Sequence, residues 1–230
     1  MTVEHATMQL DALPGGHQDV FASVSPELKA CLRRAERVVL VANNPAISAT
    51  DLHALQLGER DVVVSFNTCL KGGLLSPRSS HVLVHGYNAP DHYFFGLPMH
   101  RDLPAWLRDG GVGCFTMLVG CTQPLCPLPG VSLFHERIPL PALWNYPVER
   151  PGGKRFVGPS TGFNALVLFD ALRGQPGFEY SLATLGFSNE AGKLWGGHAW
   201  DYERAWLLRA NVTVVELQAR RKWWQWWRRC

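Results

Sequence analysis

The sequence lacks several patterns that would define its class at once. Its six cysteines form no C-x-x-C pair and have no histidine partners at zinc-ligand spacing, which argues against a structural zinc site. No run approaches about 20 consecutive apolar residues, so we expect no helix that spans a bilayer. The first residues have no basic start followed by an apolar stretch, unlike a secretory signal. We therefore expect a cytoplasmic protein whose cysteines are reduced core residues.

Size and charge indicate one globular domain with a basic end. The chain has 230 residues, of which 47% are hydrophobic, enough for one substantial core. The formal net charge is +3, but residues 220–229 carry five cations, so the remainder of the chain is slightly acidic. A body that binds nucleic acid is therefore not indicated. We expect an N-terminal arm at residues 1–24, one domain at 25–217 and a tail at 218–230.

The tail combines cations with tryptophans. Residues 219–230 read ARRKWWQWWRRC. Tryptophan favours the membrane interface and cations favour anionic lipid, so we expect peripheral attachment at the inner face of the membrane. A helix that packs its tryptophans on the domain fits the sequence equally well. Liposome flotation of the full chain and of a chain ending at Gln218 decides between them, and equal flotation would exclude the tail as an anchor.

Short apolar runs rich in β-branched residues recur along the chain. Such runs are typical of strands buried on both faces of a parallel sheet. We predict strands at 38–41, 61–69, 81–86, 112–120, 180–185 and 212–217, with a weaker one at 131–136. Helices are predicted at 26–34, around 104–108, at 160–172 and at 201–210, and a long loop at 138–157. The alternation predicts an α/β fold with a single Rossmann-like, doubly wound, mostly parallel sheet.

Asparagines follow two of the predicted strands. Asn43 and Asn44 come after the first strand, and Asn67 comes near the end of the second. In doubly wound sheets, ligands bind beyond the carboxyl ends of the strands. An amide supplies donors and acceptors without charge, which suits a ribose and a base edge. A turn before Pro45 is the competing interpretation of Asn43 and Asn44.

The segment GPSTG precedes the apolar run NALVLFDAL. Pro159 fixes φ, and Ser160 or Thr161 can cap a helix, so a plain helix start explains the pattern. A helix start is also a place where anions bind, because unsatisfied N–H groups and the positive end of the dipole point out of it. Ser160, Thr161 and Gly162 are therefore candidate ligands for a phosphate.

A histidine stands before the helix predicted at 201–210. His198 follows two glycines in GGHAWDYERAWL, and Glu203 lies five residues later. A histidine in this place is often a cap or a hydrogen-bonded structural group. A flexible loop and a charged neighbour also suit a general base, since histidine ionises near neutral pH. We therefore take His198 and Glu203 as candidate catalytic residues, and Glu203 can orient the ring or hold the helix start.

These segments together resemble the sialyltransferases, glycosyltransferase families 29 and 42. The first motif of these families is a strand with a G-N-S/G-P/G turn, then a strand ending in R-x-N or C-N; VVLVANNP and VVVSFNTC stand there. Their second motif has P-S-T-G or T-S-G, a hydrophobic helix and a strand ending in Gly-Phe or Gly-Ile, as in GPSTGFNALVLFDAL and SLATLGF. The H-x4-E of family 29 is matched by His198 and Glu203. The order and spacing agree over about residues 37–210.

The resemblance implies a GT-A-variant fold and an inverting glycosyltransferase without metal or cofactor. The donor would be a CMP-linked sugar, a sialic acid in these families, and the acceptor a hydroxyl of a glycan or glycolipid. The sequence is compatible with this, because it has no strict D-x-D to hold a cation against a pyrophosphate. The implied roles are nucleotide binding by the asparagines, phosphate and sugar binding by Ser160, Thr161 and Gly162, and general base catalysis by His198.

Two features of the families have no counterpart here. The cysteines that join the first two motifs of family 29 are absent, as in bacterial members, and Arg37 or Val38 and Phe156 hold the corresponding places. The tyrosine or histidine that binds the phosphate before the base is also missing. In its place SNEAGKLWG offers Ser188, which we take as a candidate ligand, besides Lys193 and Trp195.

Two other functions fit the same pattern. One is a different nucleotide-binding α/β transferase, which would prefer a uridine or adenosine nucleotide. The other is a relative without catalytic activity that attaches to membranes or acidic polymers through the tail.

Overall fold

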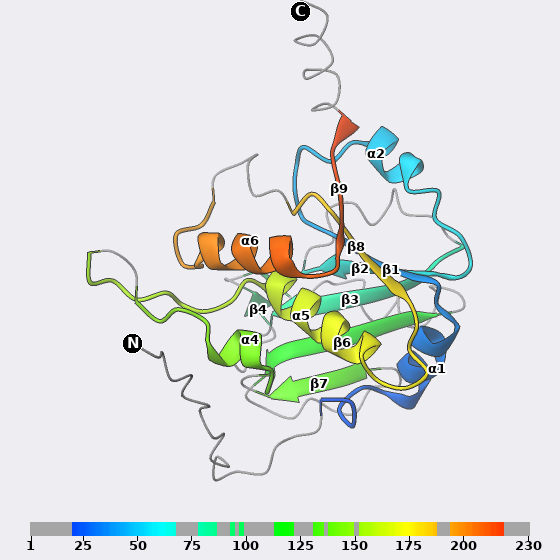
Figure 1. Ribbon diagram of the computed structural model, residues 1–230, viewed down its shortest axis with the longest axis horizontal. Coiled ribbons are helices and arrows are strands. Elements are labelled where there is room, and N and C mark those ends of the chain that lie inside the picture. The colour runs from blue at the N-terminus through cyan, green and yellow to red at the C-terminus, as the bar shows by residue number, and fades with distance from the viewer. Residues whose placement is uncertain are drawn as a thin grey trace, which may run out of the picture.

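The computed structural model describes residues 20–67, 78–86, 93–94, 97–98, 113–121, 131–135, 138–149, 152–187 and 194–218. Seven strands in these ranges form one sheet in the order β7-β6-β3-β2-β1-β8-β9, and every pairing is parallel (Figure 1). They are β1 (Arg37–Val41), β2 (Asp61–Phe66), β3 (Ser80–Gly86), β6 (Cys114–Cys121), β7 (Val131–His135), β8 (Ser181–Leu185) and β9 (Thr213–Val215). A separate pair, β4 (Tyr93–Phe94) and β5 (Leu97–Pro98), is antiparallel.

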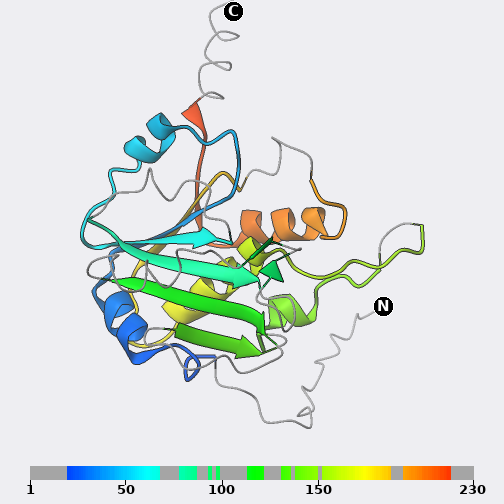
Figure 2. The ribbon, with the colours of Figure 1, turned by 180° about the vertical axis from the view of Figure 1, so that it is seen from behind.

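Helices cover both faces of this sheet. They are α1 (Pro26–Arg34), α2 (Ala49–Ala54), α4 (Pro141–Trp144), α5 (Thr161–Arg173) and α6 (Trp200–Arg209). One face of β1 and β2 packs with α1 and α5, and the other packs with α2. Figures 1 and 2 show α5 crossing one face of the strands. The fold is therefore doubly wound, and the predicted α/β class with its Rossmann-like parallel sheet is confirmed.

The strand order reverses direction next to β1. From β1 the chain builds outward through β2, β3, β6 and β7, and then returns through α5 to place β8 on the other side of β1. The β1 strand pairs with β2 from Arg37 to Leu40 and with β8 from Arg37 to Val41. Loops that leave the carboxyl ends of β1 and β8 go to opposite faces. They leave a crevice, which is the place where doubly wound sheets bind ligands.

Most predicted elements are present, with shifted ends and two corrections. The strand predicted at 61–69 ends at Phe66, and the last strand covers Thr213–Val215 only. The loop predicted at 138–157 was wrong in part, because α4 forms where Pro141 starts a single helical turn. The helix α2 was not predicted. Its signal was the capping box of Ser48 and Asp51, whose side chain and backbone bond each other reciprocally.

Four sequence expectations fall wholly or mostly outside the described residues: the N-terminal arm up to residue 19, the helix around 104–108, Ser188 and the tail from residue 219. Within the described ranges, no helix has the length and apolar character that crossing a bilayer would require.

Candidate functional site

A cavity of about 660 Å³ lies where the strand order reverses. That volume is within the usual range for a small-molecule site. The carboxyl ends of β1, β2 and β8 form one wall, and the first turns of α5 and α6 form another. Its lining residues are Ala42, Asn43, Asn44, Pro45, Phe66, Asn67, Ser160, Thr161, Gly162, Phe163, Leu166, Gly186, Phe187, Leu194, Trp195, His198, Trp200, Glu203, Arg204 and Leu207. Every sequence-predicted site residue that the structure describes is in this set.

The three asparagines connect neighbouring strands at the carboxyl edge. The Asn43 amide nitrogen donates to the Phe66 carbonyl oxygen at 2.7 Å, which joins the ends of β1 and β2. The Asn44 amide donates to the Gly186 carbonyl oxygen at 3.1 Å, across to the end of β8. The Asn67 side-chain oxygen accepts from the Gly86 N–H at 2.9 Å, which joins β2 to β3. These amides therefore have a structural use that the sequence interpretation did not include.

Asn44 also makes the turn that the sequence offered as the alternative. Its side-chain oxygen accepts from the Ala46 N–H at 2.9 Å, two residues on, while the side chain is buried. Asn67 is buried as well, with φ of 48°, and its amide nitrogen lies 3.4 Å from the Thr161 hydroxyl. Asn43 is half-buried. Nucleotide binding by the asparagines stays a prediction, and Asn43 is the most accessible of the three.

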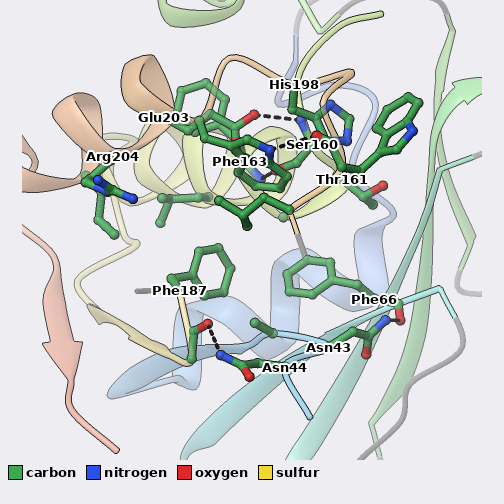
Figure 3. Close-up of a pocket in the computed structure, with 18 of the residues that line it drawn as sticks. Asn43, Asn44, Phe66, Ser160, Thr161, Phe163, Phe187, His198, Glu203 and Arg204 are labelled. Atoms are coloured by element: carbon green, nitrogen blue, oxygen red, sulfur yellow. Dashed lines mark hydrogen bonds between the residues drawn. The ribbon is translucent and has the colours of Figure 1, made fainter. Parts of the chain in front are cut away.

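Two aromatic rings and a glycine shape the middle of the cavity. Phe66 and Phe187 meet edge to face at 6.0 Å between ring centroids, and Figure 3 shows them between the asparagines and the start of α5. Gly186 has φ of 79°, and a Cβ there would lie 2.6 Å from Ile47. Only glycine meets both conditions, so the β8 end can approach the loop after β1 closely.

The start of α5 presents unpaired backbone donors to the cavity. Ser160 is the N-cap, and its hydroxyl accepts from the Phe163 N–H at 3.0 Å. The next two N–H groups, of Thr161 and Gly162, have no hydrogen-bond partner in the described part of the chain, as expected for a first helical turn. Both residues line the cavity. A Cβ on Gly162 would come within 3.2 Å of the Phe187 ring, so glycine keeps this turn close to it. The turn has the chemistry of an anion site.

Glu203 joins α6 to the start of α5. The residue is 6% exposed, and its carboxylate accepts from the Ser160 N–H at 2.9 Å, the Ser160 hydroxyl at 2.7 Å and the Tyr146 hydroxyl at 2.8 Å. The Tyr146 hydroxyl in turn accepts from the Ala199 N–H at 2.6 Å. Burial raises the pKa of the Glu203 carboxyl, against the lowering effect of these hydrogen bonds and of His198. One carboxylate thus fixes the start of α5 and the residue after the histidine.

His198 is held in one orientation. Its Nδ1 lies 2.6 Å from the Gly158 carbonyl oxygen, and the Val157 N–H donates to the Gly197 carbonyl oxygen at 2.8 Å. The imidazole contacts Trp195 and Trp200 edge to face, at 4.6 and 5.1 Å between centroids. A carbonyl oxygen only accepts, so Nδ1 carries the proton of the neutral ring. The Nε2 lone pair is then available to accept a proton, as a general base requires.

The sequence interpretation left two uses open for Glu203, orienting the histidine ring or holding a helix start. The ring nitrogen bonds Gly158 instead of Glu203, and the carboxylate bonds the N-cap of α5. Glu203 therefore holds a helix start, but it is the start of the neighbouring helix α5 and not of α6, in which Glu203 lies. The described residues show no hydrogen bond between Glu203 and the His198 ring, and Glu203 reaches the histidine loop through Tyr146 and the Ala199 N–H.

Sequence analysis missed two contributors to the site. Tyr146 lies 57 residues before its partner Glu203, in a segment that was predicted as loop, so no local pattern marked it. Arg204 follows the glutamate of the H-x4-E motif and lines the cavity. The sequence could have indicated Arg204, because it lies in the first half of a predicted helix whose start borders the site. Among the described residues, no group of three or more histidine, cysteine, aspartate or glutamate side chains has the arrangement of a metal site.

Comparison with known proteins gives one similarity. No protein-family model matches the chain, and no curated protein matches it. Among solved structures, the chain is similar to a mammalian sialyltransferase in complex with Gal-beta-1-3GalNAc-ortho-nitrophenol. The identity is 15% and the TM-score 0.40, with 90% of this chain and 82% of that chain covered. The function of the cavity has therefore to be argued from the residues that line it.

Proposed function

We propose that the protein is a glycosyltransferase that moves a sugar, a sialic acid, from a CMP-linked donor to a hydroxyl of a glycan or glycolipid. The reaction inverts the anomeric centre and uses no metal. The observation that carries the proposal is a single cavity, at the reversal of strand order, lined by unpaired helix-start donors and by a histidine with a fixed Nδ1. The motifs that resemble sialyltransferases stand at these same positions.

The start of α5 suits the one phosphate of a CMP-sugar. The N–H groups of Thr161 and Gly162 and the Thr161 hydroxyl are neutral donors beside the positive end of a 13-residue helix. Such donors stabilise the charge that develops on a departing phosphate. A nucleoside diphosphate would carry more charge, which commonly requires a cation. The aromatic rings of Phe66 and Phe187 offer apolar contact to the nucleotide.

His198 then supplies the base for the acceptor. As the bond between the anomeric carbon and the phosphate oxygen breaks, CMP leaves with the electron pair. The acceptor oxygen forms the new bond to that carbon from the opposite face, and its proton passes to Nε2 of His198. Trp195 and Trp200 contact the imidazole edge to face and limit its rotation. Attachment of the tail to an anionic membrane, which would bring a glycolipid acceptor near, belongs to the same proposal.

A nucleotide panel with one variant tests the donor class. Thermal unfolding is measured with CMP, CDP, UDP, NAD and S-adenosylmethionine, and a ligand that binds the folded state raises the midpoint. We expect CMP or CDP alone to do so. Thr161→Val should weaken CMP binding by roughly 1 to 3 kcal/mol, since one hydrogen bond to a charged group is lost.

The fold should not change in this variant, because Ser160 keeps its cap on Phe163. The control is Thr213→Val in β9, which does not line the cavity. Stabilisation by UDP, NAD or S-adenosylmethionine without CMP would point to another transferase class. Equal CMP affinity of the parent and of Thr161→Val would return the turn to a plain helix start.

A further inference from the structure

The cavity contains a cation that the described residues leave without a partner. Arg204 lies in α6, lines the cavity and is exposed. It forms no ion pair or hydrogen bond with any residue that the structure describes, although Asp201 stands three positions before it on the same helix. A guanidinium has five donors in a planar fork that matches a carboxylate or a phosphate. Because no described residue pairs with Arg204, its donors are available to a ligand in the cavity.

The neighbouring acid does not neutralise it. Glu203 is the only acidic residue among the described lining residues, and Ser160 and Tyr146 occupy its carboxylate. The two side chains also lie on different faces of α6, since Glu203 is buried and Arg204 is exposed. The open part of the described cavity therefore carries the charge of Arg204 with no accessible acid beside it. This balance favours a ligand with a negative group.

The position of Arg204 separates it from the helix-start donors. In Figure 3, Arg204 stands at one end of the cavity, and Thr161 and His198 stand toward the other, with Phe187 and Asn44 on the opposite wall. A ligand that places one oxyanion on the α5 turn can place a second near Arg204. We propose that Arg204 binds an oxyanion of the ligand in this cavity and so selects an acidic donor. This inference rests on the proposed function for the identity of that donor.

Two oxyanions of a CMP-linked acidic sugar fit this chemistry, the sugar carboxylate and the phosphate. Binding of cytidine, CMP and CMP-N-acetylneuraminic acid to the parent and to Arg204→Gln distinguishes them. Loss of a guanidinium contact should lower the affinity about tenfold. A loss for CMP-N-acetylneuraminic acid alone identifies the carboxylate, whereas equal losses for CMP and its sugar conjugate identify the phosphate and overturn the selection of an acidic sugar. Cytidine should bind both proteins alike.

Arg209→Gln is the matched control, because it removes the same charge from the same helix outside the cavity. Arg204→Lys should recover part of the affinity, and higher salt should weaken parent and Arg204→Gln unequally. Equal affinity of the parent and Arg204→Gln for every anion overturns the inference, even if CMP binds and the donor class stands. UDP and pyrophosphate extend the panel. Suppose that UDP or pyrophosphate binds the parent and binds Arg204→Gln more weakly, while CMP binds neither protein. The anion site at Arg204 would then be supported, and the proposed function would be wrong.

Discussion

Replacing His198 by alanine is expected to lower transfer by about 10²-fold or more, with CMP affinity nearly unchanged. The bond between the Nδ1 side of the ring and the Gly158 carbonyl fixes which nitrogen is free. Removal of the ring takes away the proton acceptor and leaves the helix-start donors of α5 in place. Steady-state transfer from a CMP-sugar and calorimetric titration with CMP measure the two effects separately.

His198→Asn is the sharper form of this variant. Its side-chain amide can still donate to the Gly158 carbonyl oxygen, yet it has no basic nitrogen. We expect it to fold like the parent and to lose transfer as His198→Ala does. His53→Ala, in α2 on the other face of the sheet, is the control and should keep full transfer.

The pH dependence gives an independent readout of the base. A general base acts in its proton-free form, so transfer by the parent should rise with pH. His198→Asn should lack this rise. If His198→Asn retains transfer with the parental pH profile, the histidine is structural. Unfolding of both His198→Ala and His198→Asn would lead to the same conclusion.

The strands and the location of the site follow from the sequence for a simple physical reason. A strand buried on both faces needs an apolar centre, and Val38–Val41 and Val62–Val64 are uninterrupted apolar runs that are buried throughout. Parallel strands bring their carboxyl ends to one edge, so residues after β1 and β2 had to meet. The helix start at Ser160 and the histidine loop at His198 join that edge because α5 and α6 begin there.

The hydrogen bonds that define the site do not follow from the sequence. Asn44 was compatible with a ligand contact and with a turn, and only the approach of Gly186 from β8 decides where its amide points. Tyr146 meets Glu203 across 57 residues, and no periodicity encodes that pairing. The fold class is a property of patterns along the chain, whereas these contacts depend on tertiary packing.

Replacing Glu203 by alanine is expected to have the largest effect on stability. The buried carboxylate satisfies two donors of Ser160 and the hydroxyl of Tyr146, and all three would lose their partner inside the protein. Each hydrogen bond to a charged group contributes about 1.5 to 3 kcal/mol, with effects that do not add. We expect a loss of about 3 kcal/mol in the free energy of unfolding, measured by urea denaturation.

Glu203→Gln separates the shape of the side chain from its charge. The amide fills the same space and retains one accepting oxygen, so the loss should be about half that of the alanine variant. Asp201→Asn is the matched control, because this exposed acid lies in the same first turn of α6 and should change stability by less than about 0.5 kcal/mol.

The pH dependence of the difference between the parent and Glu203→Gln carries a definite sign. Burial raises the pKa of the Glu203 carboxyl in the folded protein above its ordinary value of 4.5. A raised pKa contributes stability that is fully present below pH 4.5 and is lost as the pH rises through the folded pKa. The cost of Glu203→Gln should therefore shrink from pH 4.5 upward. A cost that grows over this range would mean that hydrogen bonding outweighs burial.

Transfer by Glu203→Gln, assayed well below its unfolding midpoint, separates a positioning role of this residue from a part in the chemical step. If Glu203 positions the α5 turn and the loop of His198, the variant should lose about tenfold or less in transfer. It should also retain the rise with pH, because the base is intact. A loss as large as that of His198→Ala, in a protein of parental stability, would instead place the carboxylate in the chemical step.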